Sequence, residues 1–238
     1  MNLSEGLVFV SDSRTNAGLD HIATFRKLHT FGIAGDRFMV LQSAGNLATS
    51  QSVVSLLRQR LHSDPRNLNS VATMFDAARL VGDTLREVVA SQSTHHMTQG
   101  IDMSCSLLLG GQITGQAPEL FNLYPQGNFI AATVDTPYFQ IGESKYGKPI
   151  LDRALCYQTP LNSALRCALI SFDSTIRSNL SVGMPLDVLV YPKDSLRLSK
   201  GYRIMEGDPY FEDMRQHWGQ NLRDLLDALP ATPSQYLN

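Results

Sequence analysis

The spacing of apolar residues changes several times along this chain, and the order of these changes constrains the fold most strongly. Short apolar runs typical of strands come first, at Gly6–Ser11, His21–Phe31 and Arg37–Gln42. Apolar residues then recur at helical spacing over Ser50–His62 and again from Met74 onward. Farther along the chain come strands, two helices, strands again and a final helix. The sequence therefore contains strand groups separated by helix pairs.

This order predicts an α+β fold, because regular βαβ alternation would be expected of a parallel sheet. Two antiparallel sheets stacked between helix layers, a four-layer αββα sandwich, account for it. The chain has no internal repeat, low-complexity stretch or linker, which predicts one domain over residues 1–238. A C-terminal helical extension is expected over about residues 206–238.

Composition excludes several classes of function. The formal charge of −2 over 238 residues gives no basic surface for nucleic acid or for an anionic membrane. No apolar run is long enough to span a membrane, and the N-terminus does not resemble a signal peptide. The three cysteines are too scattered for a metal site or a disulfide framework, so we expect buried, reduced thiols in a cytoplasmic protein.

No cofactor is expected either. Neither a phosphate-binding loop, a dinucleotide fingerprint nor a histidine–carboxylate metal motif is present. The nucleophile elbow of the α/β-hydrolases is also missing.

Chemistry is suggested by the stretch GLVFVSDSRTNAG at residues 6–18, where a buried strand ends in charged and hydroxyl side chains. A strand pair can bring Asp12 beside Lys27, and a partly desolvated lysine there can lose its proton and assist a hydroxyl nucleophile. The backbone N–H of Gly45, in a turn after a strand, can stabilise an oxyanion. Each feature also has an ordinary interpretation, as a turn, an edge lysine or a turn leading into a helix.

Taken in order, GLVFVSDSRTNAG, FRKL and LQSAGNLA resemble the proteasome β-type subunits, which are N-terminal-nucleophile hydrolases. Within that family, SDSRTNAG, TFRKLHTF and IGESKYGKPILDR are most similar to the bacterial ancestral β-subunit (Anbu) branch. The resemblance covers almost the whole chain. It implies a threonine-type endopeptidase that hydrolyses peptides or unfolded proteins inside a homo-oligomeric ring or open spiral. An ATP-driven unfoldase is a frequent partner in the family.

The resemblance also implies roles for individual residues. Asp12 and Lys27 match the active-site aspartate and lysine, and Gly45 matches the oxyanion-hole glycine. The remaining matches are Ser181, to a supporting serine, and Ser43 and Leu47, which would border the specificity pocket.

Two positions depart from the family pattern. A further supporting serine falls near residues 142–144, so that either Glu143 or Ser144, ahead of a short helix expected to open near Ser144, occupies its place. Ser144 is the catalytic candidate that we retain there. The aspartate expected three residues before Ser181 is Ser178 in this chain. The details of proton transfer are therefore open.

The nucleophile itself is the largest departure. The resemblance places an N-terminal threonine about five positions before Met1, with its own α-amino group as the base. The chain as written should therefore lack peptidase activity. Either the protein continues beyond this start, or it is a catalytically inactive subunit that assembles and binds peptides without cutting. A third interpretation, an amidase with an N-terminal cysteine or serine, fits the Asp12–Lys27 pairing less well.

Overall fold

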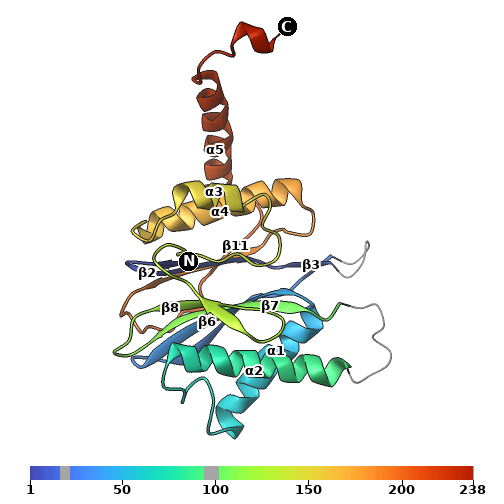
Figure 1. Cartoon of the computed structure of the whole chain (residues 1–238), viewed down its shortest axis with the longest axis vertical. Helices are drawn as coiled ribbons and strands as arrows, with labels where there is room; N and C mark the ends of the chain where they lie inside the picture. Colours follow the sequence, from blue (N-terminus) through green and yellow to red (C-terminus); the bar gives the residue numbers. More distant parts are fainter. Residues whose placement is uncertain (17–21, 94–101, 238) are drawn as a thin grey trace.

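The computed structural model describes residues 1–16, 22–93 and 102–237, and its elements form four layers (Figure 1). One outer layer contains helices α1 (Leu47–Ser63) and α2 (Met74–Ser93). The opposite outer layer contains α3 (Lys148–Ala154) and α4 (Leu161–Ser178), and two sheets lie between the helix layers. The predicted αββα sandwich of class α+β is therefore confirmed.

Both sheets are antiparallel throughout. The sheet next to α4 has the order β1-β2-β10-β11, formed by Asn2–Leu3, Gly6–Asp12, Leu186–Pro192 and Tyr202–Ile204. The other sheet has the order β5-β6-β7-β8-β9, formed by Leu28–Ile33, Arg37–Gly45, Cys105–Ile113, Glu119–Leu123 and Phe129–Ala131. A separate two-stranded hairpin joins β3 (Arg14–Asn16) to β4 (Ile22–Thr24).

Strand β2 shows how the sequence divides between two cores. Its side chains alternate, so Leu7 and Phe9 pack between the two sheets, whereas Val8 and Val10 pack on the side of α4. A strand with both faces covered needs apolar residues at nearly every position. This requirement explains the continuous run GLVFV and its abrupt end at Asp12.

Three expectations from the sequence are corrected. The run His21–Phe31 is not one strand, because β4 ends at Thr24 and β5 begins at Leu28. The short helix α3 opens at Lys148 rather than near Ser144, since Gly147 and Pro149 start it. Only Cys105 is a buried thiol; Cys156 is exposed and Cys167 is partly exposed. A single cysteine, unlike a run of apolar residues, belongs to no repeating pattern from which the burial of its thiol can be predicted.

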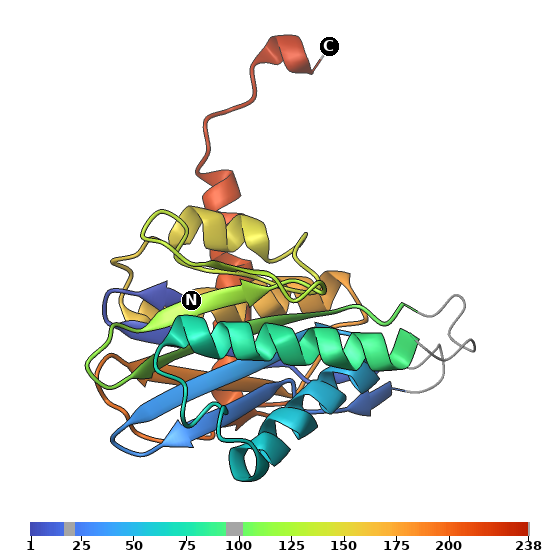
Figure 2. The ribbon, with the colours of Figure 1, turned by 60° about the horizontal axis from the view of Figure 1, so that its bottom comes forward.

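Helix α5 (Pro209–Asp227) rises from the α4 layer and projects away from the body (Figures 1 and 2). Asp208 caps its first turn by accepting a hydrogen bond from the Phe211 backbone N–H. Its base is fixed by buried Phe211 and by Arg215, whose Nε lies 2.6 Å from Oδ1 of buried Asp173 on α4. Among the described helices, none is long and apolar enough to cross a membrane.

Candidate active site

An ion pair between Asp12 and Lys27 is the central feature of the candidate site. Asp12 is the last residue of β2, and Lys27 lies directly before β5. The Lys27 Nζ is 2.7 Å from Asp12 Oδ1, and the two side chains are 19% and 10% exposed. The Lys27 carbonyl accepts a hydrogen bond from the Ser43 backbone N–H, which ties the lysine to strand β6. Asp12 and Lys27 are thus in direct contact although they lie 15 residues apart in the sequence.

Two opposing effects act on the Asp12 carboxyl. Burial raises its pKa, because desolvation disfavours the charged form, while the Lys27 ammonium opposes that rise. Backbone N–H groups of Gly183 and Arg14 also donate to the carboxyl and favour its ionised form. Asp12 is therefore held by contacts from β3, the residue before β5 and the loop before β10.

Gly45 ends β6 in a conformation that favours glycine. Its φ is +103°, and an added Cβ would lie 2.5 Å from the Ser104 carbonyl oxygen. The next residue, Asn46, caps α1 by accepting a hydrogen bond from the Thr49 backbone N–H at 3.1 Å. The chain therefore leaves the strand and enters the helix within two residues.

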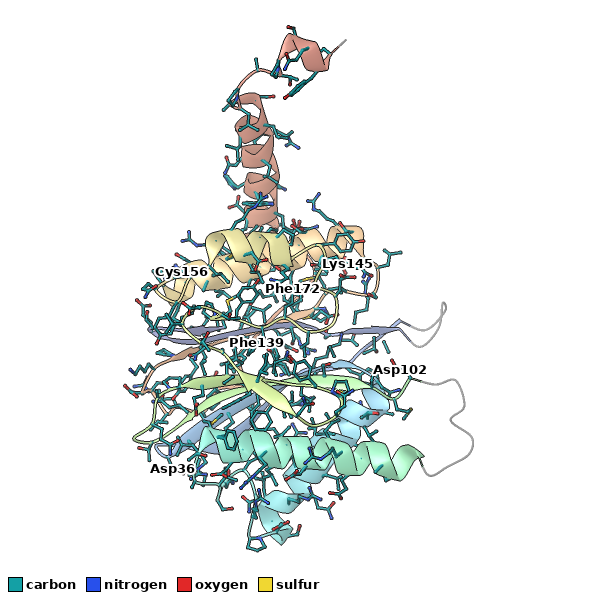
Figure 3. The ribbon with its side chains drawn as sticks, in the orientation of Figure 1. Asp36, Asp102, Phe139, Lys145, Cys156 and Phe172 are labelled. Atoms are coloured by element: carbon teal, nitrogen blue, oxygen red, sulfur yellow. The ribbon has the colours of Figure 1, made fainter. Side chains whose placement is uncertain are left out.

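A cavity of about 500 Å³ joins these features. Its aromatic wall includes Phe139 and Phe172, which are labelled in Figure 3. Most of the residues that the sequence singled out line it together: Asp12, Lys27, Ser43, Gly45, Leu47 and Ser181. Their roles in catalysis and substrate binding stay predictions, but the structure brings all six to one cavity.

The two residues left as alternatives, Glu143 and Ser144, differ in their position relative to the cavity. Glu143 lines the cavity, whereas Ser144 and Ser178 are absent from the lining formed by the described residues. Glu143 also accepts a hydrogen bond from Asn179, the C-cap residue of α4, at 2.7 Å. The structure thus places Glu143, and not the retained candidate Ser144, beside the other candidate residues.

Sequence reasoning assigned no individual role to two residues that organise the site, Asn179 and Arg14. Asn179 accepts hydrogen bonds from both the backbone N–H and the hydroxyl of Ser181. Arg14 donates from Nη1 to the Leu180 carbonyl, and its guanidinium packs against Gly183. A possible signal for Asn179 was its position at a helix exit, where asparagine commonly organises the following turn.

Several buried polar atoms of the cavity wall have no hydrogen-bond partner within the described part of the chain. They are Ser11 Oγ, Arg14 Nε, Gln42 Nε2 and Gln140 Oε1. In residues 1–16, 22–93 and 102–237, no cluster of histidine, cysteine, aspartate or glutamate is suited to a metal ion.

Three solved structures similar to this chain are all described as Anbu proteins. The chain is 60% identical to the Anbu complex from Pseudomonas aeruginosa, described as a helical assembly, over 99% of this chain and 98% of that chain, with a TM-score of 0.96. For Anbu (ancestral beta-subunit) from Yersinia bercovieri the identity is 59%, the coverage 98% and 97%, and the TM-score 0.92. A Gly-1 mutant of Anbu from Hyphomicrobium sp. strain MC1 is 45% identical over 98% and 96%, with a TM-score of 0.91. No family model and no curated protein matches the chain.

Proposed function

This chain belongs to the Anbu family of ancestral β-subunits, and on that basis we propose that it is a subunit of a self-assembled threonine-type peptidase. Its substrates would be peptides or unfolded proteins. The observation that carries the proposal is the Asp12–Lys27 pair, closed to 2.7 Å and largely buried in a cavity that Gly45 also lines. A buried lysine beside a carboxylate is suited to activating a hydroxyl nucleophile.

The register of β1 supports a nucleophile on its N-terminal side. Asn2 pairs with Leu7 and Leu3 with Gly6, so each step back along β1 advances one residue along β2. A residue preceding Met1 by four positions would therefore lie opposite Asp12. Beyond Val8, β2 has no strand partner on this edge among the described strands, and the cavity follows it to Asp12.

The chemistry then follows from the positions of the groups. The threonine hydroxyl loses its proton to its own α-amino group, with Lys27 lowering the hydroxyl pKa, and attacks the scissile carbonyl. The backbone N–H of Gly45 stabilises the oxyanion. The proton passes to the departing amine, and water then hydrolyses the acyl-enzyme ester and regenerates the threonine.

The test uses a form of the chain lengthened so that it begins with threonine about five residues before Met1, called here the threonine-bearing form. We expect it to hydrolyse fluorogenic peptides or an unfolded protein, and the same form with alanine first to be inactive. If the threonine-bearing form assembles but hydrolyses nothing, the protein is instead a non-hydrolytic assembly subunit.

Helix α5 supports assembly with further copies. Its outer half exposes a stripe of leucines, Leu222, Leu225 and Leu226, continued by Leu229. Exposed apolar stripes of this kind mark protein–protein contacts. The Pseudomonas aeruginosa relative is described as a helical assembly. We propose that the leucine stripe of α5 contacts another copy of this chain.

Replacing both Leu225 and Leu226 with glutamate should weaken this assembly at least a hundredfold. Burying each leucine at a contact is worth about 1.5–3 kcal/mol, and a buried charge without a partner adds a further cost. Sedimentation velocity over a concentration series measures the loss of large species. Gln220→Lys, on the opposite face of the helix, is the matched control and should assemble normally. Unchanged assembly of the double variant would contradict the proposed contact.

A further inference from the structure

Three residues form a hydrogen-bonded chain along one wall of the cavity. Glu143 Oε2 accepts from Asn179 Nδ2 at 2.7 Å. Asn179 Oδ1 in turn accepts from the Ser181 backbone N–H at 2.9 Å and from its hydroxyl at 2.7 Å. This chain links the loop before α3 to the loop after α4, and both its ends, Glu143 and Ser181, line the cavity.

The chemistry of these groups fixes the direction of every bond. An ionised carboxylate only accepts, so the Asn179 amide must turn its NH₂ group toward Glu143. Its carbonyl oxygen then faces Ser181 and accepts the single O–H of that side chain. The lone pairs of Ser181 Oγ remain free for donors in the cavity. The Ser181 backbone N–H, which only donates, requires the same amide orientation, so it and Glu143 together leave the Ser181 hydroxyl as an acceptor.

Surrounding groups keep Glu143 ionised. Hydrogen bonds from the Lys145 backbone N–H and from the Asn179 side chain hold the pKa of the Glu143 carboxyl below its usual value. The other charged groups near these three hydrogen-bonded residues are the Lys145 side chain, Arg14 beside Leu180, and the Asp12–Lys27 pair in the same cavity.

We infer that Glu143 is a positioning residue, which acts through Asn179 to make Ser181 the hydrogen-bond acceptor for a protonated amine in the cavity. The inference rests on the proposed function, in which that amine is the α-ammonium group of the nucleophilic threonine. The aspartate expected at position 178 is replaced by Ser178, the last residue of α4. Glu143, in the loop before α3, supplies a carboxylate to that side of the cavity instead.

The first experiment needs no peptidase activity and uses the chain as it stands with Ser181→Cys. The pH dependence of alkylation by iodoacetamide, followed by peptide mass so that each thiol is counted separately, gives the pKa of the introduced thiol. This thiol donates to Asn179 Oδ1 and lies near a negative charge, and both effects favour its neutral form. Adding Glu143→Gln removes the negative charge, while the Ser181 backbone N–H still holds the Asn179 amide in place, so the pKa of the introduced thiol should fall by roughly 0.5.

Two controls separate this effect from a general change in structure. Exposed Cys156, measured in the same molecules, should keep its pKa in both proteins. Glu206→Gln, at an exposed glutamate outside the cavity, should leave the pKa of the introduced thiol unchanged. If that pKa does not respond to Glu143→Gln, the inference is overturned. A change only in the maximal alkylation rate does the same, because it reports access.

The second experiment measures catalysis in the threonine-bearing form. Glu143→Gln should lower kcat about tenfold with KM unchanged, because Ser181 contacts the nucleophile's amine and not the substrate. Glu206→Gln should change neither constant. If the unsubstituted threonine-bearing form is inactive, the proposed function fails, while the thiol experiment still decides the role of Glu143. An unchanged kcat in an active form overturns the inference.

Discussion

Replacing Lys27 with alanine in the threonine-bearing form should lower kcat by roughly a thousandfold. Groups that transfer or stabilise a proton at the reacting centre typically contribute about 10²–10⁴-fold to the rate. Lys27 is the cation that contacts Asp12, at 2.7 Å, and its side chain lines the cavity. Steady-state hydrolysis of a fluorogenic peptide measures the effect.

Lys27→Arg separates chemistry from folding. Alanine leaves the Asp12 carboxylate buried without a counter-ion, which destabilises the fold as well as the site. Arginine keeps the positive charge and can keep the ion pair, but its planar, longer guanidinium does not place that charge where the compact lysine ammonium lies beside the nucleophile. We expect the arginine variant to fold normally and still to lose at least a hundredfold in kcat. Lys148→Ala, at an exposed pair with Asp152, should leave kcat unchanged. Substantial hydrolysis by both Lys27 variants would contradict the proposed mechanism.

Replacing Gly45 with alanine should lower kcat by about 10²–10³-fold, the usual cost of losing one oxyanion donor. Its φ of +103° is unfavourable for alanine, and the new Cβ would meet the Ser104 carbonyl oxygen at 2.5 Å. Because a backbone oxygen cannot rotate away as a side chain can, the strand end must shift, and the Gly45 N–H shifts with it. Peptide hydrolysis and thermal unfolding should be measured together.

Gly115→Ala is the matched control for backbone strain. Gly115 also has a positive φ, +76°, but an added Cβ there meets nothing within 4 Å. This variant should lose only about 1–2 kcal/mol of stability and keep its kcat. If Gly45→Ala loses stability to the same extent but retains full activity, Gly45 does not form the oxyanion hole.

Much of the fold could be predicted from the sequence, because it depends on local spacing. The apolar run at Gly6–Ser11 and the helical spacing over Ser50–His62 correspond to β2 and α1, within a few residues at their ends. The interval from His21 to Phe31 was interpreted wrongly as one strand. Its residues suit a strand individually, but the chain must leave the β3–β4 hairpin and enter the other sheet there, with Phe25–Lys27 between the two.

The candidate site was predicted only in part. The order of short motifs indicated Asp12, Lys27 and Gly45, and the structure brings these residues to one cavity. The order of the motifs did not distinguish Glu143 from its neighbour Ser144. Adjacent residues in an irregular loop point in different directions, and no periodicity records which of them faces the cavity.

The sequence by itself therefore determined the layered fold, the family and a set of residue types, because periodicity and motif order are local properties. Only the tertiary structure decided which of those residues meet. The 2.7 Å contact between Asp12 and Lys27 depends on where two sheets stack. The hydrogen bond from Asn179 to Glu143 joins loops 36 residues apart. Such contacts are set by the packing of whole layers, which no short stretch of sequence specifies.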